Sequence, residues 1–283
     1  MDSFEPKRSR RSRLWLGCAA LCVLTAVPLE AGVEIKIRTV DHSAPTPRVE
    51  TSVMTIEGHN LKLEMLTVSG TEQQRRGMIY QGQRERALVV DHGNKAYTPI
   101  DRGTIQKLGE DIQRTMAEID RQIAELAPEQ RQTVKKALED AEKVSPAVVE
   151  KTEETGKTLG LETVKYLVRR DGEIERETWV ANWDQLPESD EVRAALEGMG
   201  GLLGELVKAF EGIASSTLGV QVFGEGSNPF EDLERMGGFP VTTRNFKGKR
   251  MTSETSLQGI ETKAVDPLSF NPPDSYELRA MTQ

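Results

Sequence analysis

The sequence is short of several residue types on which common kinds of site depend. Its 283 residues include only two cysteines and three histidines, and aromatic residues make up 5%. This composition excludes disulfide-rich scaffolds and zinc-finger arrays. Lys and Arg together number 37 against 45 Asp and Glu, a net charge of -8, whereas nucleic-acid-binding proteins usually carry a basic face. We therefore expect no nucleic-acid partner. The 37% of hydrophobic residues is enough to build the core of one or two ordinary domains.

The N-terminal residues have the layout of a secretory signal peptide. Five basic residues lie between positions 7 and 13, and the apolar run 14–29 leads into Glu30-Ala31-Gly32. That run contains Pro28 and is shorter than the ~20 residues that a membrane-spanning helix needs. We expect residues 1–31 to be a signal peptide cleaved near Ala31, and the protein to be exported to the periplasm or the extracellular space. An uncleaved membrane anchor is the alternative.

Two variants of this signal fit the sequence less well. Ser9-Arg10-Arg11 resembles a twin-arginine signal, but Arg13 stands where an apolar residue is expected. Lipid attachment at Cys18 or Cys22 is disfavoured, because little apolar sequence precedes the first and a bulky leucine precedes the second. Cleavage would remove both cysteines and leave 32 basic against 42 acidic residues, a net charge of -10. We therefore expect no disulfide-linked partner and no thiolate metal site.

Residues 33–101 alternate between apolar and polar side chains in short runs. Such alternation predicts strands with one buried face. Gly58-His59-Asn60 and Asp91-His92-Gly93-Asn94 are plausible turns between successive strands. The segment therefore predicts an antiparallel meander.

The pattern changes to a helical one at Arg102. Apolar residues recur every three or four positions from Ile105 to Leu126, which predicts a long amphipathic helix. Pro128 suits the first turn of a second, highly charged helix with Val134, Leu138 and Ala141 on one side. We therefore predict a charged helical insertion over about residues 102–157.

Strands return after this insertion, with a hairpin turn at Asp171-Gly172 and another at Lys247-Gly248-Lys249. Between them, a third helix is predicted from near Ser189 to Ile213, and a glycine-containing loop over 224–238. A closing strand is predicted at 276–279. The fold class is α+β: a large curved antiparallel sheet of about ten strands, an open half-barrel, wrapped around helices. Residues 32–283 would form a single domain.

Familiar catalytic motifs are incomplete. Gly156-Lys157-Thr158 resembles the end of a phosphate-binding loop, but Lys151 replaces the first glycine and a strand is predicted to follow. Gly224-Glu225-Gly226 has Pro229 in place of the third glycine of a dinucleotide fingerprint. Asp41-His42 and Asp91-His92 each end a predicted strand and could join as metal ligands, although Asp and His are also common turn residues. We expect no catalytic residues, metal or cofactor.

The third predicted helix is unusually apolar and rich in glycine. It carries Gly198, Gly200, Gly201 and Gly204, and an interior glycine costs about 1 kcal/mol relative to alanine. Either the helix backbone approaches the sheet closely, or its wide apolar surface lines a cavity or contacts lipid. Trp179 and Trp183 are candidate apolar walls, with packing in the sheet or core as the alternative. The candidate cavity residues are Met199, Leu202, Leu203, Leu206, Phe210 and Trp179.

Four stretches in this order are similar to a known family. They are 77–101 with Asp91-His92-Gly93-Asn94, the hairpin end Thr178-Trp179-Val180-Ala181, the strand entry Gly238-Phe239-Pro240-Val241, and Phe270-Asn271-Pro272-Pro273 up to Tyr276. Together they resemble the exported bacterial domain of unknown function 4412, which is similar to the LolA-like lipoprotein-carrier half-barrels. The resemblance implies a curved antiparallel sheet around helices with an apolar cavity between them, and it transfers no functional residue.

These observations predict a non-enzymatic envelope protein that binds a lipid, an acyl chain or a lipidated partner. The alternative is a structural or protein-interaction module that uses the charged helical arm. An uncharacterised hydrolase is the third possibility.

Overall fold

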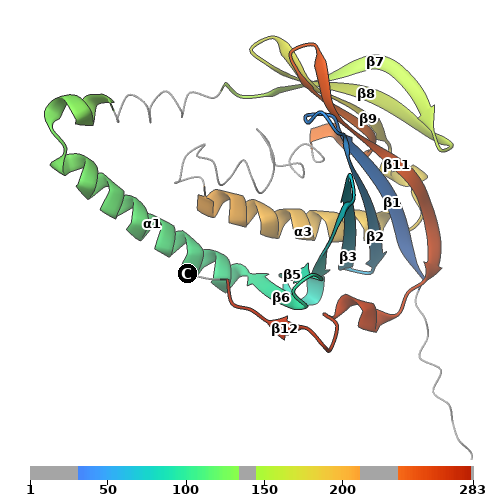
Figure 1. Cartoon of the computed structure of the whole chain (residues 1–283). Coiled ribbons are helices and arrows are strands. Elements are labelled where there is room, and N and C mark those ends of the chain that lie inside the picture. Colours follow the sequence, from blue (N-terminus) through green and yellow to red (C-terminus); the bar gives the residue numbers. More distant parts are fainter. Residues whose placement is uncertain (1–30, 134–144, 211–234, 282–283) are drawn as a thin grey trace, which may run out of the picture.

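One sheet organises the chain in the computed structural model, which describes residues 31–133, 145–210 and 235–281 (Figure 1). Within these residues the sheet has twelve strands. They are β1 (Ala31–Asp41), β2 (Arg48–Glu57), β3 (Asn60–Ser69), β4 (Glu72–Gln81), β5 (Arg86–Asp91), β6 (Ala96–Asp101), β7 (Val148–Thr158), β8 (Leu161–Arg170), β9 (Glu173–Ala181), β10 (Phe239–Lys247), β11 (Arg250–Ala264) and β12 (Glu277–Leu278).

The strand order is β12-β6-β5-β4-β3-β2-β1-β11-β10-β9-β8-β7. Two meanders, β1 to β6 and β7 to β11, therefore meet where β1 pairs with β11. Every neighbouring pair is antiparallel except β12 and β6, which run parallel. The sheet stays open, with β12 and β7 at its edges. The predicted α+β class and the large sheet are confirmed, whereas a wholly antiparallel arrangement is corrected at β12.

The predicted turns lie where short loops join the strands. Gly58 has a φ of 55° between β2 and β3, and Gly172 has a φ of 84° between β8 and β9. Gly248 turns the chain between β10 and β11 with a φ of 61°. Only glycine adopts these angles at no steric cost, so these turns are encoded locally.

The predicted helical insertion is wrong at its C-terminal end, because residues 148–158 form β7. This strand lies at the sheet edge and most of its side chains are exposed, so its charged sequence does not alternate in hydrophobicity. Inside the insertion, α1 (Arg102–Glu125) and helical residues 128–133 begin where predicted. Val134, Leu138 and Ala141 lie outside the described residues.

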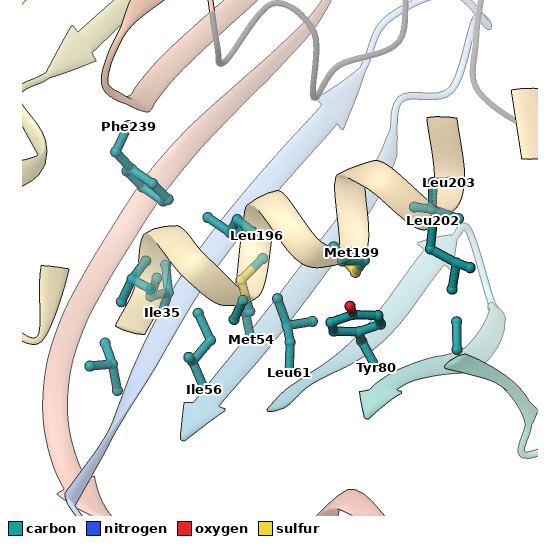
Figure 2. Close-up of a cluster of buried hydrophobic side chains, with 14 of the residues drawn as sticks. Ile35, Met54, Ile56, Leu61, Tyr80, Leu196, Met199, Leu202, Leu203 and Phe239 are labelled. Atoms are coloured by element: carbon teal, nitrogen blue, oxygen red, sulfur yellow. The ribbon is translucent and has the colours of Figure 1, made fainter. Parts of the chain in front are cut away.

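Two long helices lie on one side of the curved sheet: one crosses its concave face, whereas α1 starts at β6 and runs away from the sheet (Figure 1). The second of them, α3 (Ser189–Phe210), begins at the predicted residue. It packs over β1 to β5, and Figure 2 shows Leu196 and Met199 of α3 among Met54, Leu61 and Tyr80 of the sheet. This contact forms the centre of the main core.

The opposite, convex face is covered over β4 to β6 by the C-terminal residues. A second apolar cluster lies here, made by Ile79, Leu88, Val90, Val265 and Phe270. Its members on β4 and β5 alternate along the strands with residues that face the main core. Phe270 ends the short helix η4 (Pro267–Phe270), and its carbonyl accepts a hydrogen bond from Gln81 Nε2 at 2.8 Å. The segment 265–281, which we call the C-terminal strap, then pairs with β6 through β12.

Several predictions lie outside the described residues. They are the signal peptide up to residue 30, the helical position Ile213, and most of the glycine-containing loop 224–238. Phe210 ends α3, but its side chain is not among those described.

Candidate functional site

Four of the predicted cavity residues belong to the main core. Met199, Leu202, Leu203 and Leu206 are between 3% and 6% exposed and contribute to the cluster that joins α3 to the sheet. They come together as the helical spacing predicts, and their packing accounts for their apolar character. A ligand cavity along this face of α3 stays a prediction.

Trp179 lies on β9, half-buried at the edge of that core. Gly156 of β7 provides room for its ring, because a Cβ there would lie 2.9 Å from Trp179 Cζ3. On the same face, Lys165 Nζ lies 5.9 Å from the centre of the ring and 3.5 Å from Glu177 Oε1. Trp183 also lies at the edge of the core, and its ring packs edge-on against Phe239. Both tryptophans keep apolar surface beyond the core.

Close approach of helix and sheet explains one of the glycines of α3. A Cβ on Gly198 would lie 2.7 Å from the hydroxyl oxygen of Tyr80, closer than packing allows. Gly201 has open space around the position of its Cβ and is exposed. The close-approach interpretation is therefore confirmed for Gly198 and does not apply to Gly201.

An apolar row on the concave face continues beyond the cover of α3. Cross-strand pairing aligns Ile35 with Met54, Met54 with Leu63, Leu63 with Met78 and Met78 with Val89. Exposure rises along this row: Ile35 is 0% exposed, Met54 8% and Val89 40%, with Leu63 and Met78 partly buried between them. We call Leu63, Met78 and Val89 the open row. Sequence alternation predicted these residues on one face, but only the position of α3 shows which of them stay partly exposed among the described residues.

On the convex face, two of the stretches that carry the family resemblance meet. His92 Nδ1 lies 2.8 Å from the hydroxyl of Tyr276, and His92 Nε2 lies 2.9 Å from Glu64 Oε2. A Cβ on Gly77 would lie 3.2 Å from His92 Nε2, so glycine leaves room for the imidazole. Glu64 also pairs with Arg75 at 3.2 Å and with Lys62 at 3.2 Å. This arrangement fastens the C-terminal strap to the sheet.

The aspartates of the two Asp-His pairs act as turn residues, as one of the two interpretations predicted. Asp41 Oδ1 accepts a hydrogen bond from the backbone N–H of Ser43, and Asp91 Oδ1 accepts one from that of Asn94. Hydrogen bonds from the side chains of Ser43 and Asn94, together with those from their backbone N–H groups, lower the pKa of the two carboxyls. The pairs end β1 and β5, which β2, β3 and β4 separate. Within the described part of the chain, no group of three or more His, Cys, Asp or Glu side chains is arranged to hold a metal ion.

Comparisons with known proteins leave the family open. No protein-family profile and no curated protein matches the chain. Two solved structures of PNGF-II are similar over 89% of this chain, with 11% and 12% sequence identity and TM-scores of 0.30 and 0.32. The chain spans 31% of their length. A similarity this weak carries no argument about function. None of the described helices is long and apolar enough to cross a membrane.

Proposed function

We propose that the protein is a non-enzymatic envelope protein that binds an apolar ligand: a lipid, an acyl chain or a lipidated partner. The observation that carries this proposal is the open row, an apolar strip on the concave face that α3 leaves partly uncovered. A concave sheet with helices over it can shelter ~300–1,000 Å³ of ligand. The wide apolar face of α3 would form the neighbouring wall.

The finer fold assignment is also a proposal. An open, mostly antiparallel sheet with a helix across its concave face agrees with a LolA-like half-barrel and with the resemblance to the domain of unknown function 4412. Export, with a signal peptide cleaved near Ala31, belongs to the same proposal. N-terminal sequencing of protein from the native cell tests it, and a mature chain that retains residues 7–13 would contradict it.

The open row allows a test that leaves the core intact. Val89→Gln should abolish or strongly weaken ligand binding, because it places an amide in the apolar strip. Leu66→Gln is the matched control: Leu66 is also 40% exposed, but strand alternation puts it on the convex face, opposite Leu63. Both variants should keep their stability within about 0.5 kcal/mol of the parent, as surface substitutions usually do.

Binding should be measured in two ways. Native mass spectrometry followed by organic extraction would identify a lipid that co-purifies, and displacement of a fluorescent fatty acid would give affinities. We expect Leu66→Gln to bind as the parent does. Equal binding by both variants, or a parent that carries no lipid and ignores the fluorescent fatty acid, would overturn the proposal.

A further inference from the structure

One basic side chain lies beside the open row on the concave face. Arg76 of β4 is two residues from Met78, and strand alternation puts both side chains on the same face, about 7 Å apart along the strand. Arg76 pairs in register with Met65 of β3, which is two residues from Leu63. In the next row of the sheet, the open row is therefore flanked by Met65 and Arg76.

The charge of Arg76 is not balanced by an ion pair. Arg76 is exposed, and among the described residues no carboxylate pairs with its guanidinium. The acid opposite it in register is Asp91 of β5. The two carboxylate oxygens of Asp91 accept hydrogen bonds from the backbone N–H and the Nδ2 of Asn94, at 3.0 and 2.7 Å. These bonds are the main cause of the lowered pKa of Asp91, and the cation that adds to the shift is Arg279 of the strap.

A second acid on the concave face is engaged in the same way. Strand alternation places Glu50 of β2 on this face, where its two carboxylate oxygens accept hydrogen bonds from the hydroxyls of Ser52 at 3.4 Å and Thr67 at 3.0 Å. The whole of β3 separates β2 from β4. Glu50 therefore binds its neighbouring hydroxyls and leaves Arg76 without a partner.

The other basic residues close to Arg76 have an acid beside them. Arg75 belongs to the convex face, where its Nε lies 3.2 Å from Glu64 Oε2. Within the described strands β1 to β6, alternation puts one further basic residue on the concave face, Arg48, which pairs in register with Asp41 at the far end of β1. Arg76 is thus the cation that stands beside the open row with its charge available to a ligand.

We infer, and this rests on the proposed function, that the ligand is a long-chain fatty acid whose carboxylate binds Arg76 while its chain lies along the open row. A guanidinium and a carboxylate are complementary in charge and shape, and can join through two parallel hydrogen bonds. The adjoining apolar side chains strengthen such a pair by lowering the local dielectric constant. The open row contributes one side chain per strand, which suits one acyl chain better than the two chains of a phospholipid.

Ligands that differ only in the head group test this assignment on the full chain. At neutral pH the parent should bind laurate about fivefold to tenfold more tightly than dodecanol, measured by displacement of the uncharged fluorescent probe N-phenylnaphthylamine. Arg76→Gln should abolish this preference by weakening laurate binding and leaving dodecanol binding unchanged. Arg75→Gln is the matched control, because it removes the same charge from an adjacent, exposed residue on the convex face. We expect it to keep the preference of the parent.

Two further variants separate the head group from the chain. Val89→Gln should weaken the binding of laurate and dodecanol to the same extent, because both chains lie along the open row. Arg76→Glu should reverse the preference, so that dodecylamine binds more tightly than laurate. Thermal unfolding would establish that each variant is folded, which the exposed positions of Val89 and Arg76 favour.

Three outcomes would overturn the fatty-acid assignment and leave the proposed function standing. One is equal binding of laurate and dodecanol by the parent. Another is an equal loss of laurate binding in Arg76→Gln and Arg75→Gln, which would indicate attraction by net charge alone. The third is tighter binding of dodecyl phosphate than of laurate that depends on Arg76, which would assign a phosphate head group. A parent that binds none of these ligands would overturn the proposed function as well.

Discussion

Asp101 is the residue at which the chain leaves the sheet and begins α1. Its Oδ1 accepts hydrogen bonds from the backbone N–H and the hydroxyl of Thr104, both at 2.8 Å. These bonds satisfy one of the free N–H groups at the helix start and lower the pKa of the carboxyl. A single side chain therefore caps the start of α1.

Replacing this cap should destabilise the protein in a predictable way. Asp101→Ala should lower the free energy of unfolding by about 0.5–2 kcal/mol, measured by chemical denaturation. Asp101→Asn should lower the free energy of unfolding by less than Asp101→Ala does, because an amide oxygen can also cap a helix.

The pH dependence of the cap follows from the direction of the pKa shift. Since the pKa of Asp101 is lower in the folded state, the ionised carboxyl stabilises the protein at pH values above the pKa of a free aspartate, ~3.9. That contribution is lost as the pH falls through the lower, folded value. The stability difference between the parent and Asp101→Asn should therefore be constant near neutral pH and shrink in acid. A difference that grows in acid would contradict this.

Glu34 belongs to a group of paired, opposite charges at the centre of the sheet. It lies on β1, buried, where it pairs with Lys263 of β11 and with Lys36 at 3.2 Å. Burial opposes ionisation of Glu34, but the hydrogen bonds from Lys263 and Lys36 outweigh it and lower its pKa. Lys36 also bonds Glu261 at 2.8 Å. Opposite charges thus pair directly across β1 and β11.

At the scale of elements, α3 contains two glycines with opposite expected effects. Gly198→Ala should destabilise the protein, because the new Cβ would lie 2.7 Å from the Tyr80 hydroxyl. Gly201→Ala should stabilise it by up to about 1 kcal/mol, because alanine favours the helix and meets open space.

Tyr80 provides the control for this comparison. Burial raises the pKa of its hydroxyl, and Tyr80→Phe removes the atom nearest to the new methyl group. Combined with Gly198→Ala, it should recover part of the lost stability in a double-mutant cycle by denaturation. Independent, additive effects of the two substitutions would show that the contact is not the cause.

Elements with one buried face could be predicted from the sequence, and elements exposed on both faces could not. Apolar residues alternate in β1 and recur every three or four positions in α3, because each element buries one face in the main core. Both elements therefore begin close to where they were predicted. The first residues of β4, from Glu72 to Arg76, are exposed and polar, so they lack the alternation that marks a strand with one buried face. The same exposure hid β7.

The candidate site was predictable to the same extent. The apolar residues of α3 could be identified because their spacing is local. The open row depends on how far α3, which lies more than 90 positions later in the sequence, extends across the sheet. No local pattern in the strands encodes that distance. The pairing of His92 with Tyr276 joins residues 184 positions apart, which spacing along the chain cannot reveal.

At the scale of the whole molecule, the C-terminal strap covers a part of the convex face that no long helix covers among the described residues. Phe270 is 3% exposed against Ile79, Leu88 and Val90, whereas Leu268 in the same short helix is 73% exposed. The strap also covers the edge of β6, which would otherwise present unpaired backbone groups. It thus protects both an apolar patch and a strand edge.

This difference predicts the effect of two substitutions in η4. Phe270→Ala should cost about 3–5 kcal/mol, as for other buried aromatic residues, and should increase hydrogen exchange in 265–281 and along β6. Leu268→Ala should change stability by less than about 0.5 kcal/mol. Similar losses in the two variants, or an exchange pattern unchanged by Phe270→Ala, would show that the strap is not held by Phe270.

The pairing of β1 with β11 has a consequence for biosynthesis. The first strand described occupies the middle of the sheet, yet one of its two neighbours, β11, is translated only after β2 to β10. During translation, β2 to β6 can assemble on one side of β1 while its other edge waits for residues 250–264. Partners so far apart in the sequence close slowly, and an unpaired edge invites aggregation. We therefore expect the second edge of β1 to stay unpaired in a nascent chain, and so open to aggregation, until residues 250–264 have been translated.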